Sequence, residues 1–426
     1  MSGAVLTPTA LGAMLSDGPP RRDTFVGWQH YRTARGRFTP APRITLAAWR
    51  RLSPHERSLY DLHRTATHVN LPLLETPMSL KVSRLVHRRL LNNSLKQKPA
   101  TRAGVMVTGW GYQGKTETVC EVAAAFEDTW LALHGHLNPA AVEGTWDLHA
   151  PVAYVQTPVT AKPKSTCQAV LDFFGAGTKN MNLPQLIGQV AQSLHDHGVK
   201  ALILDDITRL RMHRADDQDT LDLIRAFMSM NVTLILVGVD IPGSGLLREA
   251  RWEPRARQWV MPSSTRARVH GFEATQTERR FDLVELDRFR TSTAKETAAF
   301  LAHLAGLEGH VRLLKAKPGM LTGGGMPEYL MRRTGGVVGL LERLIEDGAQ
   351  QAMDTGRELL DESLLDEIVI SLDDPGRDPG AGEVPVIPGT TTAPMPAAKV
   401  RARARRPGRN TVFDDRGPRA ADSAGG

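Results

Sequence analysis

The stretch Gly109-Trp-Gly-Tyr-Gln-Gly-Lys-Thr116 follows an apolar run, Val105–Thr108, and opens a helical stretch, Thr116–Glu127. It matches the pattern G-x-x-x-x-G-K-[ST] of phosphate-binding loops. In such a loop, glycines let backbone N–H groups turn inward around phosphate oxygens, and the helix start adds partial positive charge. Lys115 is then placed to neutralise the β- and γ-phosphates and the Thr116 hydroxyl to bind Mg²⁺. We predict that ATP is bound by Gly109, Gly111, Gln113, Gly114, Lys115, Thr116 and Glu117.

A second segment, Ala201-Leu-Ile-Leu-Asp205-Asp206, is an apolar strand that ends in two acids. In this Walker-B arrangement, Asp205 is expected to hold Mg²⁺, directly or through water, and Asp206 to orient or deprotonate the attacking water. One further strand, Val152–Gln156, lies between this segment and the phosphate-binding loop. Glu is the usual residue at the position of Asp206. The Asp side chain is one methylene shorter, so we expect ATP hydrolysis to be slow.

The middle of the chain alternates short β-branched runs with helical periodicity. Right-handed crossovers between such strands give a parallel sheet covered by helices on both faces, so we predict an α/β fold. The expected strands are 105–108, 152–156, 201–204, 233–237 and 283–286, and the expected helices between them include 164–174, 184–196 and 219–229.

Composition along the chain indicates five parts. A tail rich in Pro, Gly, Thr and Ala cannot bury enough apolar area to fold, and it ends in an arginine cluster between Arg401 and Arg409. After about residue 290 the strand signal stops and four helices are expected, at 292–306, 326–333, 337–354 and 361–371. The predicted parts are a disordered extension (1–43), a helical N-terminal region (44–100), the α/β core (101–290), a helical lid (291–372) and a disordered basic tail (373–426).

The charge and cysteine content limit the classes of partner and compartment. The chain has 426 residues and a net charge of +7, which favours an anionic partner, with nucleic acid as the first candidate. Cys120 and Cys167 have no Cys or His neighbours at ligand spacing, which argues against a cysteine-based zinc site, and two cysteines fit a reducing compartment. No run of about 18 apolar residues occurs. We therefore expect a cytoplasmic protein that does not enter a membrane.

With these segments in order, residues from about 65 to 370 resemble the AAA+ ATPases of the TniB/TnsC transposition group. The resemblance rests on the loop, the two acids and several further segments. These are Tyr154-Val-Gln-Thr-Pro158, Lys164-Ser-Thr166, Leu204-Asp-Asp-Ile207, Val237-Gly-Val-Asp-Ile-Pro-Gly-Ser-Gly-Leu246, Arg280-Phe-Asp-Leu-Val-Glu-Leu286, Pro318-Gly-Met-Leu-Thr322 and Thr334-Gly-Gly-Val-Val-Gly339.

The resemblance implies an ATP-dependent regulator that forms rings or filaments on duplex DNA and recruits a DDE-type transposase without cutting DNA itself. It places the segment after the second strand against DNA, which implies contacts from Lys162, Lys164, Thr166 and Lys179. Exposed Lys and Thr side chains are suited to phosphate contact. Read without the resemblance, these residues form an ordinary basic surface loop.

Three further positions take their expected roles from the same resemblance. Asp240, after the strand 233–237, stands where AAA+ proteins place a sensor of the γ-phosphate, although a loop-capping Asp is an equal alternative. Arg280, favoured over Arg279, stands where an arginine finger reaches into a neighbouring subunit, although paired arginines are commonly plain surface. Gly339 and Leu340 occupy the place of a lid arginine in many AAA+ proteins, and Arg343 is the nearest substitute.

Other functions share parts of this pattern. A helicase loader or replication initiator would have the same core and also act on DNA. A signalling or defence ATPase would switch by nucleotide and never bind DNA. A small-molecule P-loop kinase is disfavoured by the strand that intervenes before Asp205.

Overall fold

The structure, a computed structural model, describes residues 18–137, 149–159, 162–209, 217–241, 251–253, 258–260 and 278–370. All of them belong to one compact unit within residues 1–390. The N-terminal residues 1–17 and the predicted basic tail, 373–426, lie outside the described residues. Within the described residues no helix is both long and apolar enough to cross a membrane.

A five-stranded parallel sheet forms the centre of the core, in the order β2-β3-β4-β1-β7. Its strands are β1 (Gly104–Thr108), β2 (Val152–Gln156), β3 (Ala201–Asp205), β4 (Thr233–Val237) and β7 (Phe281–Glu285). The predicted α/β fold is confirmed. β1, β3 and β4 are buried along their whole length, as expected for strands covered on both faces. The register aligns Val107 of β1 with Val237 of β4, and the carboxyl ends of the strands therefore meet at one edge.

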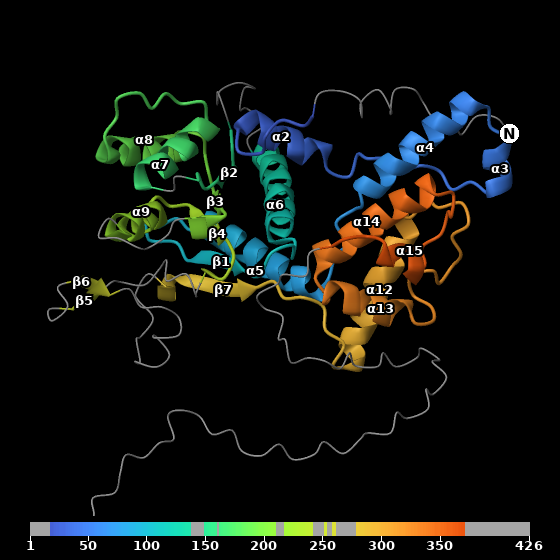
Figure 1. Cartoon of the computed structure of the whole chain (residues 1–426). Helices are drawn as coiled ribbons and strands as arrows, with labels where there is room; N and C mark the ends of the chain where they lie inside the picture. The colour runs from blue at the N-terminus through green and yellow to red at the C-terminus, as the bar shows by residue number, and fades with distance from the viewer. Residues whose placement is uncertain are drawn as a thin grey trace, which may run out of the picture. The chain divides into compact units, whose positions relative to one another are not determined.

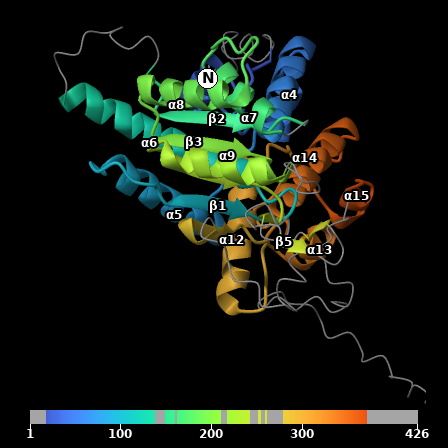
Figure 2. The ribbon, with the colours of Figure 1, turned by 90° about the vertical axis from the view of Figure 1, so that its left-hand side faces the viewer.

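Helices cover both faces of this sheet (Figures 1 and 2). One layer contains α7 (Pro163–Phe173), α8 (Leu183–Asp196) and α9 (Asp217–Ser229), and the other contains α5 (Pro77–Ser94) and α6 (Lys115–Leu137). The predicted helices are present, and α6 continues to Leu137 rather than ending at Glu127. Short elements complete the core: η1 (Ile207–Arg209), η2 (Glu278–Arg280), and the antiparallel pair β5 (Arg251–Glu253) and β6 (Gln258–Val260).

The expected loose extension is wrong for residues 18–43, because helix α2 (Phe25–Ala34) folds onto the core. Trp28 is fully buried, and its indole N–H donates to the Glu127 carboxylate of α6. Burial raises the pKa of Glu127 to about 7. Arg32 pairs with Asp128, also on α6, at 2.6 Å. A single buried aromatic side chain and a few ion pairs dock this helix, and contacts of this kind leave no periodic pattern in the sequence.

The lid contains α12 (Ala294–His310), α13 (Met326–Thr334), α14 (Val338–Asp354) and α15 (Glu362–Asp366). Its apolar side chains form a hydrophobic cluster separate from that of the sheet. The lid helices lie where they are predicted, except that α15 ends at Asp366. Two N-terminal helices, α3 (Leu46–Arg51) and α4 (Pro54–Val69), precede α5, and α4 packs against α14 (Figure 1).

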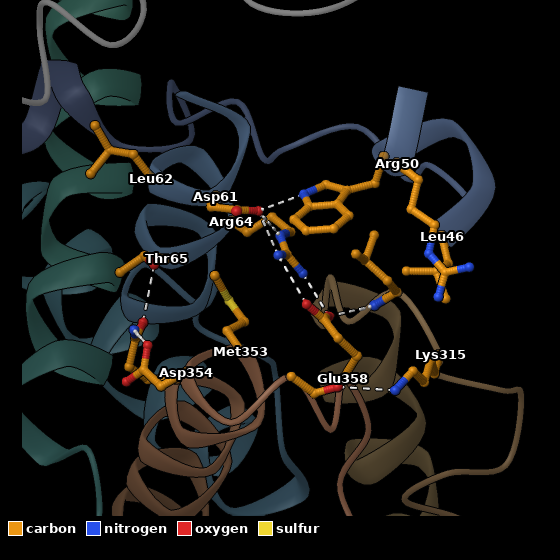
Figure 3. A pocket seen from close by; sticks show the side chains of 14 residues that line it. Leu46, Arg50, Asp61, Leu62, Arg64, Thr65, Lys315, Met353, Asp354 and Glu358 are labelled. Atoms are coloured by element: carbon orange, nitrogen blue, oxygen red, sulfur yellow. Dashed lines mark hydrogen bonds and ion pairs between the residues drawn. The ribbon is translucent and has the colours of Figure 1, made fainter. Parts of the chain in front are cut away.

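A buried ion pair joins α4 to the lid. Arg64 of α4 is 1% exposed and reaches Glu358, in the turn after α14, at 2.7 Å (Figure 3). Glu358 also accepts the backbone N–H of Leu314 at 2.9 Å. On its other side, Arg64 pairs with Asp61, which in turn accepts the indole N–H of Trp49 at 3.0 Å. The Arg64 guanidinium thus lies between two carboxylates from separate parts of the chain and also donates to the Arg312 carbonyl oxygen at 3.2 Å.

We expect Glu358→Ala to lower the free energy of unfolding by about 3 kcal/mol, because it leaves the buried Arg64 with Asp61 as its remaining carboxylate partner and removes the two-point contact to Glu358. Urea unfolding followed by circular dichroism measures this change. Asp347→Ala, which removes the exposed partner of Arg343, is the matched control and is expected to cost about 0.5 kcal/mol or less. Equal small effects of the two variants would contradict a structural role for the buried pair.

Candidate nucleotide-binding site

The predicted phosphate-binding loop connects β1 directly to the first turn of α6. Its first residue, Gly109, has φ +152°, and a Cβ there would lie 2.4 Å from Gln113 Oε1 and 2.5 Å from the Leu286 carbonyl oxygen. Only glycine fits this position. The Gln113 side chain is buried, and its Oε1 has no hydrogen-bond partner among the described residues. The loop is therefore a tight backbone turn with an unsatisfied polar atom inside it.

Lys115, the first residue of α6, folds its side chain back into the loop. Its ammonium group donates to the Trp110 carbonyl oxygen. Burial lowers the pKa of Lys115, and the nearby charges of Asp205 and Asp206 oppose this shift. Lys115 is thus a partly buried cation at the start of a helix. A buried positive charge next to helix-start N–H groups favours an anion such as phosphate.

The two predicted magnesium ligands lie in contact. The Thr116 hydroxyl donates to Asp205 Oδ2 at 2.9 Å, although the residues belong to α6 and to the end of β3. The Tyr154 hydroxyl donates to the same oxygen at 2.7 Å, and the Asp206 backbone N–H donates to the other oxygen, Oδ1, at 2.9 Å. Asp205, 4% exposed, is therefore held in one orientation by three donors.

Sequence reasoning assigned no role to Tyr154 or Gln156. Both lie on β2, two residues apart and hence on one side of the strand, and Gln156 donates to Asp206 Oδ2 at 3.3 Å. Burial, followed by the neighbouring Asp205 carboxylate, raises the pKa of Tyr154, so its phenol remains a donor. Asp206 has φ +52°, a left-handed conformation that is costly for a residue other than glycine. The polar spacing Tyr154-x-Gln156 in an otherwise apolar strand was the available signal.

A cavity of about 430 Å³ opens beside these acids. Its lining combines the end of the sheet with the N-terminal segment before α2: Arg21, Arg22, Asp23, Thr116, Glu117, Tyr154, Gln156, Asp205 and Asp206. Glu117, a predicted nucleotide-binding residue, pairs with Arg22 at 2.8 Å. Nothing in the sequence around Arg22 indicated a place in the site, because the segment has neither periodicity nor a motif.

The lid touches the loop through a glycine. The Gly339 N–H, at the start of α14, donates to the Tyr112 carbonyl oxygen at 2.8 Å, and a Cβ on Gly339 would lie 2.6 Å from that oxygen. Tyr112 itself has φ +57°, so its carbonyl turns outward toward the lid. Arg343, the suggested substitute for a lid arginine, pairs with Asp347 one turn later at 3.4 Å. The absence of a side chain at Gly339 thus lets the lid approach the loop closely.

Asp240 and Arg280 lie at opposite edges of the sheet. Asp240 is exposed with φ +42°, just beyond β4, and the next residue, Ile241, donates its N–H to Thr108 Oγ1 at 3.1 Å. It therefore lies at the edge that carries the loop. Arg280 is exposed at the start of β7, where Phe281 pairs with Gly104 at the beginning of β1. The length of β1, roughly 16 Å, separates it from the loop of its own chain.

The predicted DNA contacts are only partly accessible. Lys162 and Lys164, at the start of α7, and Lys179 in the following loop are exposed. Thr166 is fully buried, and its hydroxyl donates to the Lys162 carbonyl oxygen at 3.1 Å. The expectation of a DNA contact from Thr166 is therefore wrong, because the first turn of α7 directs this side chain inward.

Comparisons with known proteins agree with this geometry. Residues 99–241 match the family model described as "AAA domain". Among solved structures, the chain is similar to the Orc1 protein of Aeropyrum pernix in complex with DNA, with 14% identity, a TM-score of 0.46, and coverage of 71% of this chain and 67% of that one. The Cdc6p structure from Pyrobaculum aerophilum has 11% identity, a TM-score of 0.42, and coverage of 69% and 67%.

A Drosophila ORC structure bound to DNA has 11% identity, a TM-score of 0.41, and coverage of 80% of this chain and 72% of that one. No curated protein sequence matches the chain. The parallel sheet and the loop between β1 and α6 establish that the chain has the α/β fold of the P-loop NTPases, and residues 99–241 are similar to an AAA domain.

Proposed function

We propose that this protein binds and slowly hydrolyses ATP. The observation that carries the proposal is the 2.9 Å contact between Thr116 and Asp205, next to the partly buried Lys115. It brings a hydroxyl, a carboxylate and a cation together at the mouth of a backbone turn. That combination has one common use in proteins, which is to hold a nucleoside triphosphate with its metal ion.

The residues present fit Mg²⁺. Thr116 and Asp205 supply hard oxygen donors, and Mg²⁺ is usually held by one or two such side chains together with substrate phosphates and water. When bound, the ion neutralises charge on the β- and γ-phosphates. Tyr154 and the Asp206 N–H fix the Asp205 carboxylate, so this ligand would need no reorientation.

Asp206 is the residue we assign to the attacking water. Its carboxylate lines the cavity and is oriented by the Gln156 amide at 3.3 Å. Its backbone has φ +52°, a left-handed conformation of the kind that is often found at functional sites. Asp240, at the same edge of the sheet, is proposed as a second polar group near the terminal phosphate.

We further propose that ATP binding assembles the protein on duplex DNA and that the assembly recruits a DDE-type transposase. Support comes from the net charge of +7, from the exposed side chains of Lys162, Lys164 and Lys179, and from the resemblance to the TniB/TnsC group. Arg280 is proposed as the finger that completes a neighbour's site. Its place at the sheet edge opposite to its own loop supports action between subunits rather than within one.

Lys115→Ala is expected to abolish ATP binding, because Lys115 is the cation inside the loop. Asp206→Asn should retain ATP binding while hydrolysis falls at least about tenfold, since Thr116 and Asp205 remain in place. Titration calorimetry with ATP and a phosphate-release assay measure the two effects. ATP affinity in Lys115→Ala equal to that of the parent protein would rule out the proposed site.

If Arg280 acts between subunits, Arg280→Ala should leave ATP binding nearly intact and reduce hydrolysis by about 10³-fold. Mixing the inactive Arg280→Ala and Lys115→Ala proteins should then restore part of the activity, because a mixed interface can hold one complete site. Arg279→Ala, which changes the exposed neighbour, is the control. Absence of rescue in mixtures shown to form joint oligomers would make Arg280 a plain surface residue.

DNA binding is expected to be ATP-dependent, tolerant of sequence and strongly salt-sensitive. The logarithm of the affinity should fall linearly with the logarithm of salt concentration, with a slope of roughly −0.9 per phosphate contacted. Fluorescence anisotropy of labelled duplex DNA with ATP, with ADP and with neither measures this. Replacing Lys162 and Lys164 with Ala should remove chiefly the ATP-dependent part, and deleting residues 373–426 should weaken binding in every nucleotide state.

A matched pair of results decides between the functional alternatives. No binding at low salt in any nucleotide state would favour a signalling ATPase that does not contact DNA. Binding that ignores nucleotide and disappears with residues 373–426 would retain DNA as a partner and exclude assembly gated by ATP.

A further inference from the structure

Arg22 lies inside the nucleotide site although it precedes the P-loop by more than eighty residues. Its side chain lines the cavity that also contains Thr116, Asp205 and Asp206. Its guanidinium is bound to Glu117, the residue that follows Thr116, by two contacts of 2.8 and 3.0 Å. A cation from the N-terminal segment is thereby held one residue away from the predicted magnesium ligand.

The position of Arg22 is fixed by aromatic contacts as well as by charge. The guanidinium carbon lies 5.1 Å from the centre of the Tyr31 ring and 5.6 Å from that of Tyr154. Tyr154 is the residue whose hydroxyl donates to Asp205. A guanidinium held over two rings is stabilised by cation–π attraction and restricted in orientation. Arg22 is thus connected to Asp205 through a single side chain.

The segment that carries Arg22 is anchored to the P-loop helix. Trp28 is buried against Glu127, and Arg32 and Arg35 both reach Asp128, at 2.6 and 2.7 Å. These anchors lie three turns or so along α6 from Thr116. Arg22 therefore lies just before a helix that is fastened to α6, the helix that begins with Lys115 and Thr116.

Carboxylates outnumber cations in the lining of this cavity. Its lining includes four carboxylates, from Asp23, Glu117, Asp205 and Asp206, and two arginines, Arg21 and Arg22. The terminal phosphate of a nucleoside triphosphate would add further negative charge beside Asp205 and Asp206. The Arg21 side chain is 80% exposed and pairs with Asp23. The Arg22 side chain is partly buried and pairs with Glu117 in the cavity lining.

We propose that Arg22 binds the terminal phosphate of the nucleoside triphosphate held by its own subunit, and thereby makes the site discriminate a triphosphate from a diphosphate. This inference rests on the proposed ATP site. Glu117 keeps the Arg22 guanidinium beside the cavity. A phosphate carries more charge and more acceptor oxygens than a carboxylate, so it is a stronger partner for the planar guanidinium donors. The N-terminal segment then acts as an intramolecular counterpart to the Arg280 of a neighbour.

The test compares the affinities of full-length protein for ADP and for the non-hydrolysable β,γ-methylene analogue of ATP, with Mg²⁺, by titration calorimetry. The protein is diluted until it is monomeric by light scattering, which excludes contributions from a neighbour. We expect Arg22→Ala to weaken binding of the triphosphate analogue about tenfold or more and binding of ADP about twofold or less. Arg22→Gln, which keeps most of the side chain's length, should behave like Arg22→Ala. Arg22→Lys should restore part of the preference for the triphosphate analogue.

Arg21→Ala is the matched control, since Arg21 is the adjacent arginine and is held by Asp23 alone in the described contacts. It should leave the ratio of the two affinities unchanged. The melting temperature of each variant reports whether α2 remains docked.

One result would overturn the inference while leaving the ATP site intact. An unchanged ratio of the two affinities in Arg22→Ala, whether both stay the same or both fall by the same factor, would show that Arg22 only fastens the N-terminal segment to Glu117. Failure of the parent protein to bind either nucleotide would instead overturn the proposed function, and the inference with it.

Discussion

The contact between Thr116 and Asp205 depends on the strand order of the sheet. Thr116 follows β1 and Asp205 ends β3, and these two strands are not neighbours, since β4 lies between them. The two side chains meet because all three strands are parallel and end at one edge. Helix α6 then begins above this edge and carries Thr116 across β4 toward β3. Loss of the parallel register would separate the loop from the acid that it needs.

Charge balance is the second constraint on the site. Burial disfavours the charged form of Lys115, while Asp205 and Asp206 favour it. The site is therefore stable only because cations and carboxylates are arranged around one another. Burial also raises the pKa of Tyr154, which keeps its phenol as a donor to Asp205 at every physiological pH. A bound phosphate would add a partner for Lys115, and its metal ion would add a partner for Asp205.

The helices that precede β1 connect the core and the lid. α2 is docked on α6 through Trp28, whereas α4 is tied to the lid through Arg64 and Glu358. The lid in turn touches the loop through Gly339 and Tyr112. The proposed nucleotide site thus has two links outside the sheet: α2, which is docked on α6, and the lid, which reaches the loop through the start of α14.

The sequence by itself determined the sheet, the loop and the two acids. Apolar strands of four or five residues, a glycine-rich turn and a helix start are local signals, and local backbone preferences specify them within a few residues. It also determined the lid helices, whose apolar periodicity is strong. Only the tertiary structure decided the rest of the site. The docking of α2 rests on the buried Trp28 indole and on two arginines that pair with Asp128. The inward direction of Thr166 rests on the first turn of α7, and the approach of Gly339 on a missing side chain. Arg22 reaches Glu117 across 95 residues. Contacts of this kind join distant residues through packing and charge, and no spacing along the chain encodes them.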